Sequence, residues 1–109
     1  MRAASAAAAA TVLLLTGCGG GGATSTRTVH LTPQEERGRQ LFVRNCGSCH
    51  TLAAAGTHGS AGPDLDAHPW REVYVREVIA SGPGLMPADL AAGADADAVA
   101  AYVAAVTSR

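Results

Sequence analysis

Apolar side chains recur at helical spacing in three stretches of the chain, and no stretch alternates apolar and polar residues as a strand does. In the first stretch, about residues 33–45, Leu41 and Phe42 follow Gly38 at the third and fourth positions and share its face. Thr32 begins a capping box with the glutamate three positions later, and a proline stands at the first helical position. This stretch therefore predicts a helix that begins directly after Thr32.

The other two stretches predict two more helices. About residues 69–81 gather four apolar side chains on one face and charged residues on the other, with Pro69 at the expected first position. About residues 95–107 repeat apolar side chains around Tyr102, and Asp95 suits the N-cap. Irregular segments rich in glycine and proline separate the helices. The pattern as a whole predicts an all-α fold.

The first 17 residues predict a signal peptide. Arg2 is followed by a run of small and apolar residues that is too short to span a bilayer comfortably as a mature helix. The next motif, Leu15-Thr16-Gly17-Cys18, resembles the bacterial lipobox, which implies transfer of a diacylglycerol to the thiol of Cys18 and cleavage before it. An ordinary secretory signal that is cleaved nearby, with Cys18 incidental, is the alternative.

A glycine-rich segment, residues 18–31, separates the predicted leader from the first helix. Four consecutive glycines and a series of small polar residues cannot pack a core, so we expect a flexible tether. The folded domain is then expected to cover residues 32–109. A tethered domain of this kind would meet partner proteins at a membrane surface.

The composition favours a bound prosthetic group. The chain has 109 residues with 13 glycines and only 4% aromatic residues, so one small domain would bury little apolar surface unaided. A buried, flat, apolar cofactor would supply the missing surface. The formal net charge is −1 and there is no lysine, so the chain has no basic surface suited to nucleic acid.

Cys46, Cys49 and His50 form the sequence C-x-x-C-H, which is the spacing for covalent attachment of a c-type haem. Each thiol adds to one vinyl group of such a haem, and the following histidine is placed to bind the iron as its proximal ligand. Three other uses of the cysteines stay open at this point: a zinc site completed by His58 and His68, a redox-active pair and a plain disulfide. Each of these two histidines is also typical of a solvated loop or turn.

Two loops and the start of the second helix carry further candidates. Met86 lies among glycines and prolines instead of on a helix face, and its thioether is a soft ligand for iron. Pro63 has no N–H beside its carbonyl, which makes this carbonyl a candidate acceptor for the second ring nitrogen of His50. Trp70 has an N–H that needs a partner when buried, and a haem propionate is a candidate.

In this order, these features resemble the class I cytochromes c, of the small bacterial monohaem type, over about residues 32–109. The resemblance implies a small cytochrome c fold with irregular loops around one haem c. It implies covalent attachment through Cys46 and Cys49, with His50 and Met86 as the two axial ligands.

The resemblance also implies roles for residues that do not bind the iron. The carbonyl of Pro63 is expected to receive the N–H of the proximal histidine. Gly38 and Phe42 match the pattern of the N-terminal helix, and Tyr102 matches an aromatic residue of the C-terminal helix that crosses it at Gly38. The chain lacks the lysines with which some members dock their partners, so we expect docking through an apolar patch around the haem edge.

Together these features predict a one-electron carrier, not an enzyme, with His/Met ligation in a membrane-associated respiratory or other redox chain. The alternatives are a haem-bearing electron-transfer subunit of a larger oxidoreductase, an open-site haem enzyme that uses His58 or His68, and a haem-free zinc or disulfide lipoprotein. The expected partners are redox proteins that donate and accept the electron, with no role for nucleic acid. The expected location is the outer face of the cytoplasmic membrane or the periplasm, with a lipid anchor at Cys18.

Overall fold

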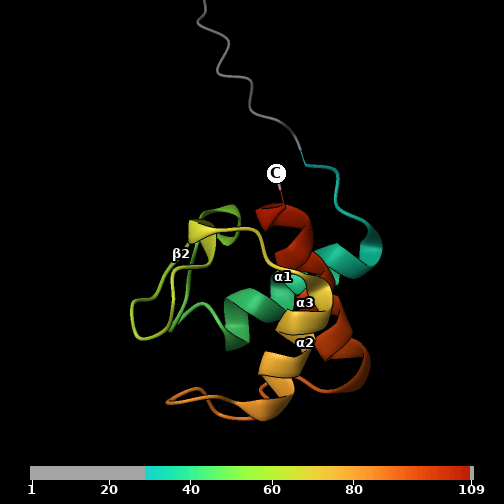
Figure 1. Cartoon of the computed structure of the whole chain (residues 1–109). Coiled ribbons are helices and arrows are strands. Elements are labelled where there is room, and N and C mark those ends of the chain that lie inside the picture. Colours follow the sequence, from blue (N-terminus) through green and yellow to red (C-terminus); the bar gives the residue numbers. More distant parts are fainter. Residues whose placement is uncertain (1–28, 109) are drawn as a thin grey trace, which may run out of the picture.

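The computed structural model describes residues 29–108, so the predicted signal peptide, Cys18 and most of the tether lie outside the described residues. Three α-helices pack together, and the segment between the first two extends to one side (Figure 1). The elements in chain order are α1 (Pro33–Asn45), β1 (Thr51–Leu52), η1 (Ala53–Ala55), β2 (Thr57–His58), η2 (Leu65–Ala67), α2 (Glu72–Ser81) and α3 (Gly93–Thr107). The predicted all-α fold is confirmed, with η1 and η2 as single 3₁₀ turns.

Helix α1 has the bounds that the sequence predicts because its start is determined locally. The amide of Glu35 donates to the Thr32 hydroxyl at 3.2 Å, and the amide of Thr32 donates to a carboxylate oxygen of Glu35 at 2.8 Å. These two bonds form the predicted capping box. At the other end, the amide of Cys46 donates to the Phe42 carbonyl at 2.8 Å, so the cysteine motif begins at the helix C-cap.

Helix α2 begins at Glu72, three positions later than predicted, and Pro69 is not its first residue. The reason is a long-range contact: the amide of Trp70 donates to the Thr107 hydroxyl at 3.0 Å. The backbone around Trp70 is thus held against the end of α3 instead of entering the helix. The helix ends as predicted at Gly82, which adopts the left-handed conformation with φ of 56°.

Helix α3 begins at Gly93, two residues before the predicted start, and Asp95 is not its N-cap. The carboxylate of Asp95 instead accepts from Arg37 Nε at 2.9 Å and from Arg37 Nη2 at 2.6 Å. Asp95 therefore joins α1 to α3 across the surface. Arg76 of α2 makes a similar link, because its Nε donates to a carboxylate oxygen of Asp97 on α3 at 2.7 Å.

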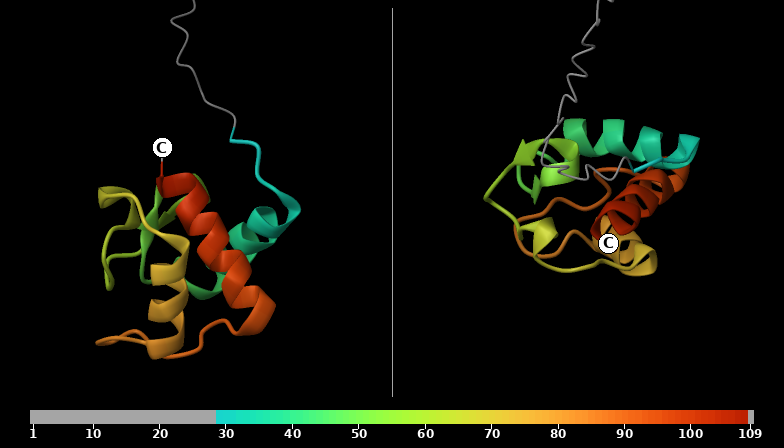
Figure 2. Two further views of the ribbon diagram at one scale, coloured as in Figure 1. Left: turned by 45° about the vertical axis from the view of Figure 1, so that its right-hand side comes forward. Right: turned by 90° about the horizontal axis from the view of Figure 1, so that it is seen from above.

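The core lies where α1 crosses α3, and Figure 2 shows this crossing from two sides. Gly38 is buried there, and a Cβ atom at its position would overlap the carbonyl oxygen of Ala98 and lie 2.8 Å from Cβ of Tyr102. The rings of Phe42 and Tyr102 meet edge to face, with centroids 6.2 Å apart. Gly38 thus lets the two backbones approach closely enough for the large side chains to interlock.

A short antiparallel pair, β1 with β2, was not predicted from the sequence. The pair places Thr51 opposite His58 and Leu52 opposite Thr57, directly after the cysteine motif. Two residues per strand are too few to show an alternating pattern in the sequence. Among the helices of residues 29–108, none is long and apolar enough to cross a membrane.

Candidate haem site

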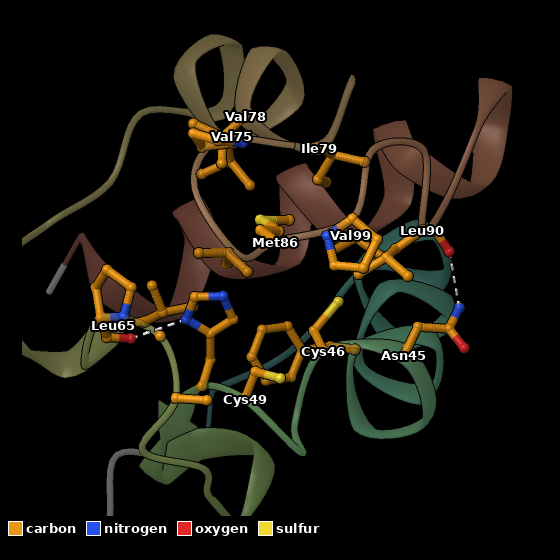
Figure 3. A pocket seen from close by; sticks show the side chains of 18 of the residues that line it. Asn45, Cys46, Cys49, Leu65, Val75, Val78, Ile79, Met86, Leu90 and Val99 are labelled. Carbon is orange, nitrogen blue, oxygen red and sulfur yellow. Dashed lines mark hydrogen bonds between the residues drawn. The ribbon is translucent and has the colours of Figure 1, made fainter. Parts of the chain in front are cut away.

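A cavity of about 460 Å³ lies between the helices and the loops that follow α1 and α2 (Figure 3). Its size is in the range of small-molecule and cofactor sites. Its walls are mostly apolar and come from every helix and both loops, including Phe42, Leu65, Val75, Ile79, Val99 and Val103. The same cavity is lined by Cys46, Cys49, His50, Pro63, Trp70 and Met86. The structure therefore brings together the residues that the sequence nominated for the haem site.

The cysteines and the histidine are held in one tight turn at the end of α1. The amides of Cys49 and His50 both donate to the Cys46 carbonyl, at 3.1 and 3.0 Å. Cys46 is buried and Cys49 is exposed. Both cysteines line the cavity in spite of this difference in exposure.

Burial raises the pKa of the Cys46 thiol to about 11. At this pKa the thiol is protonated near neutral pH. Both Cys46 and Cys49 are free in the structure. Within residues 29–108, no three histidine, cysteine or acidic side chains come together as a metal site, so a zinc set with His58 and His68 is not assembled there.

The imidazole of His50 is held from the side of the 59–65 loop. Its Nδ1 lies 2.8 Å from the carbonyl oxygen of Pro63. A carbonyl only accepts, so Nδ1 carries the proton and the lone pair of Nε2 remains available to a metal. A hydrogen bond of this kind fixes the ring of a metal-binding histidine and raises its basicity.

Gly62 makes room for this imidazole. A Cβ at Gly62 would lie 2.5 Å from Cε1, 2.9 Å from Nδ1 and 3.1 Å from Nε2 of His50. The amide of Gly62 also donates to the Cys49 carbonyl at 2.8 Å, which ties the loop back to the cysteine motif. Only a residue without a side chain fits against the ring at this distance.

Met86 comes from the loop after α2 and faces the same cavity. Figure 3 shows its side chain between the α2 residues Val75, Val78 and Ile79 and the two cysteines. The amide of Met86 donates to the Pro83 carbonyl at 3.1 Å, so the thioether projects from a turn. Its neighbour Leu85 points to solvent and is 94% exposed.

Other bonds tie this loop to the helices on either side. The amide of Asp89 donates to the Ile79 carbonyl of α2 at 2.9 Å. The side-chain amide of Asn45 on α1 donates to the Leu90 carbonyl at 3.3 Å. The loop that carries Met86 is therefore anchored at its far end to two helices.

The indole N–H of Trp70 has a partner within the protein. It donates to the Leu65 carbonyl at 3.0 Å, so its burial is satisfied without a haem propionate, and the predicted propionate contact stays a prediction. The indole lines the cavity and stacks in parallel on Tyr74, with ring centroids 5.7 Å apart. His68 also packs on Trp70, with 3.9 Å between the ring centroids, and neither His68 nor His58 lines the cavity.

Thr57 is a residue of this region that the sequence did not single out. Its hydroxyl donates to the His50 carbonyl at 2.9 Å and accepts from the Leu52 amide at 3.2 Å. A threonine in a glycine-rich loop gives no sequence signal for such a role. Its contact with His50 could have been predicted only if the hairpin after the cysteine motif had been predicted as well.

The donor set fits a covalently attached haem. Two thiols, an imidazole with a free Nε2 and a thioether surround one apolar cavity, and Gly62 lets the 59–65 loop pack directly against the imidazole. An all-α fold of three helices with these groups between its loops defines a small c-type cytochrome.

Comparison with known proteins identifies the family. Residues 33–103 match the family described as cytochrome c oxidase, cbb3-type, subunit III, and the chain belongs to this family. The chain is also similar to a cbb3-type cytochrome c oxidase subunit, FixPc, of Rhizobium leguminosarum bv. viciae. The two are 38% identical over 58 residues, which is 49% of this chain and 20% of that protein. The chain therefore spans only a part of that relative's length.

A solved structure covers the same domain. The c-type cytochrome SorU from Sinorhizobium meliloti is 34% identical and superposes with a TM-score of 0.63, over 68% of this chain and 91% of that one. This agreement and the family match establish a cytochrome c domain with covalently bound haem c, whose function is electron transfer.

Proposed function

We propose that this chain is a one-electron carrier whose haem is attached through Cys46 and Cys49 and bound axially by His50 and Met86. When bound, the haem supplies an iron that alternates between the ferrous and ferric states. The observation that carries the proposal is the pairing of His50 with Pro63 on one side of a cavity that also holds the Met86 thioether.

The protein's own contribution is to hold two ligands and to exclude water. The hydrogen bond from His50 Nδ1 to Pro63 leaves a basic Nε2 aimed away from the loop. A methionine as the second ligand raises the reduction potential relative to a second histidine. Apolar walls around the ligands lower the local dielectric, which stabilises the less charged state of the centre.

The decisive experiment is Met86→Ala, with Leu85→Ala as the matched control. Both changes truncate an apolar side chain in the same loop, but Leu85 is 94% exposed while Met86 is packed against the core. We expect Met86→Ala to abolish the optical band of thioether–iron ligation, lower the potential and allow carbon monoxide to bind rapidly. Leu85→Ala should change none of these.

Two results would overturn the proposal. If Met86→Ala leaves the spectrum and the potential unchanged, Met86 is not an axial ligand. If the wild-type protein binds cyanide or carbon monoxide fast, the iron has an open site and the enzyme alternative gains support. A pyridine haemochrome assay on the exported protein tests the covalent attachment itself, and a colourless product loaded with zinc would end the haem assignment.

A second candidate function is a haem-bearing subunit of a larger oxidoreductase. The family name and the name of the Rhizobium relative both refer to a cbb3-type oxidase subunit, which favours this reading. Purification of the tagged full-length chain from solubilised native membranes distinguishes the two. Partner chains that co-purify in a fixed stoichiometry, in a complex of one molecular mass, favour a subunit. A monomer that exchanges electrons in solution favours a free carrier.

We also propose that the domain is exported and attached to a membrane by a diacylglycerol on Cys18. The lipobox-like motif that ends at Cys18 supports this proposal. A lipid with two acyl chains is sufficient for stable anchoring. Mass spectrometry of the mature N-terminus should show the modified cysteine, and Cys18→Ser should move the haem protein from the membrane fraction to the soluble one. An unmodified N-terminus elsewhere would contradict the anchor.

A further inference from the structure

The hairpin formed by β1 and β2 folds back over the cysteine motif that precedes it. Thr57, on β2, donates its hydroxyl proton to the carbonyl of His50 at 2.9 Å. The Leu52 carbonyl lies farther from the same hydroxyl, at 3.5 Å, so the single proton belongs to the His50 bond. The oxygen of Thr57 also accepts the Leu52 amide at 3.2 Å. One side chain thus joins both strands to the backbone of His50.

The rest of the hairpin packs against the same peptide. A Cβ at Gly59 would lie 2.5 to 2.6 Å from backbone atoms of Cys49 and His50, so this glycine rests directly on their peptide bond. Thr51 holds Gly59 in place, because its hydroxyl donates to the Gly59 carbonyl at 2.9 Å. The hairpin is therefore a cover over the backbone that carries His50.

The methyl group of Thr57 has a second contact. Its Cγ2 lies 2.5 Å from the position that a Cβ would take at Gly47, inside the cysteine motif. Thr57 is consequently in contact with both Gly47 and His50, one through its methyl group and one through its hydroxyl.

His50 is held at three points. Its amide donates to the Cys46 carbonyl at 3.0 Å, its ring Nδ1 pairs with the Pro63 carbonyl at 2.8 Å, and its own carbonyl accepts from Thr57. The first and third bonds fix the backbone from which the ring projects, and the second fixes the ring itself. Without the Thr57 bond, the peptide after His50 can rotate and carry the imidazole with it.

We propose that Thr57 is a positioning residue for the proximal imidazole, acting through the carbonyl of His50. This inference rests on the proposed role of His50 as an axial ligand. It adds a side chain to the site that neither the cysteine motif nor the methionine loop contains.

Three variants of the haem-loaded, full-length protein separate the hydroxyl from the methyl group. Thr57→Val keeps the shape and removes the hydroxyl, Thr57→Ser keeps the hydroxyl and removes the methyl group, and Thr57→Ala removes both. Thr51→Val is the matched control, because it removes a 2.9 Å hydroxyl bond in the same hairpin that ends on Gly59 instead of His50.

Proton NMR of the ferric protein is the first measurement, since the shifts of the haem methyl groups report the orientation of the axial imidazole. We expect Thr57→Val to change the pattern of the haem methyl shifts and the reduction potential. Thr57→Ser should show the wild-type values of both.

Amide hydrogen exchange is the second measurement. Thr57→Val removes both bonds of the hydroxyl, the one to the His50 carbonyl and the one from the Leu52 amide, so exchange at His50 and Gly62 should quicken at least about fivefold, and it should stay near wild type in Thr57→Ser.

The outcomes are distinct. Wild-type methyl shifts in Thr57→Val, or equal changes in Thr57→Val and Thr51→Val, would overturn the proposal, the second because it shows only a loosened hairpin. If Thr57→Val does not accumulate with haem, the comparison of Thr57→Ser with Thr57→Ala decides, since these differ only in the hydroxyl. The wild-type spectrum tests the ligands separately: absence of a methionine methyl signal shifted by the haem contradicts the His/Met assignment whatever Thr57 does.

Discussion

The ring nitrogen Nδ1 of His50 lies 2.8 Å from the carbonyl oxygen of Pro63, which follows it by 13 positions in the chain. The acceptor is a backbone group, so no substitution at Pro63 removes it. The pair depends instead on how closely the loop approaches the imidazole. Gly62, whose amide is tied to the Cys49 carbonyl at 2.8 Å, determines that approach.

Gly62→Ala should therefore displace His50. Gly62 has no left-handed backbone conformation, so an alanine is allowed there by its φ angle, but its Cβ would lie 2.5 Å from Cε1 of the imidazole. Either the ring or the loop has to move, and the bond to Pro63 lengthens in both cases. We expect altered haem methyl shifts, a changed potential and a loss of about 1–3 kcal/mol in the free energy of unfolding.

Gly93→Ala is the control for that experiment. Gly93 begins α3 with φ of 54° and nothing lies within 4 Å of its missing Cβ, so an alanine there is strained without touching the site. A similar loss of about 1–2 kcal/mol is expected, because the left-handed conformation is unfavourable for alanine. The spectrum and the potential should stay as in wild type. Identical spectra for both variants would show that Gly62 does not limit the ring.

Gly38→Ala should destabilise the domain in spite of the better helix propensity of alanine. The added methyl group overlaps the backbone of Ala98, which cannot move aside as a flexible side chain does. Because the overlap is with backbone atoms, we expect an overpacking cost at the upper end of the usual range, about 3 kcal/mol, against a propensity gain of about 1 kcal/mol, so the net loss should be about 2 kcal/mol. Denaturant unfolding measures it. Gln40→Ala, on the exposed face of α1, should stay within about 0.5 kcal/mol of wild type. Equal stability of the two variants would mean that the helices can separate at no cost.

The parts of this structure that the sequence predicted are those determined by neighbouring residues. The start of α1 follows from Thr32 and Glu35, which bond to each other three positions apart. The start of α2 was predicted wrongly because the amide of Trp70 is bound by Thr107, a contact over 37 positions that no local pattern contains.

At the candidate site, too, the sequence predicted some residues and missed those that only the folded chain brings together. The cysteine motif and Met86 are chemically distinctive residue types, so the sequence nominated them and the structure gathers them around one cavity. The contact between Thr57 and His50 uses a common side chain, and only the hairpin brings it into reach. The bond from the Trp70 indole to the Leu65 carbonyl was likewise not predicted, because a backbone acceptor leaves no signal in the sequence.

Leu85→Ser should slow electron exchange without changing the redox centre. Leu85 is 94% exposed and stands beside Met86 at the edge of the cavity, which is unusual for a large apolar side chain unless a partner covers it. Loss of part of that apolar contact, about 1.4 kcal/mol, corresponds to a tenfold change. We expect the self-exchange rate, measured by NMR line broadening in mixtures of ferrous and ferric protein, to fall about tenfold at an unchanged potential.

Val73→Ser is the control for docking at Leu85. Val73 is 59% exposed on α2 and does not line the cavity. Its substitution also replaces an exposed apolar side chain by serine without a change of charge, so the exchange rate should stay near wild type. Equal slowing in both variants would indicate a general surface effect, and no slowing in Leu85→Ser would remove this side chain from the docking surface.

Tyr102→Phe should stabilise the domain, and increasingly so at alkaline pH. The ring of Tyr102 is fully buried between α1 and α3, and its hydroxyl has no hydrogen-bond partner within the described part of the chain. Burying such a group costs free energy, so its removal should leave stability unchanged or raise it by about 1 kcal/mol at neutral pH.

The alkaline part of that prediction follows from the pKa of the phenol, which burial raises from an ordinary value of 10.0 to about 12. Because the folded state keeps its proton longer than the unfolded state, the stability of the wild type is full below about pH 10 and falls as pH rises toward 12. The total loss is about 2–3 kcal/mol. Denaturant unfolding between pH 7 and 12 should show this loss in wild type and in Tyr74→Phe, whose ring is 50% exposed, but not in Tyr102→Phe. If the free energy of unfolding falls equally with pH in all three proteins, the buried phenol is not the cause of the loss of stability at alkaline pH.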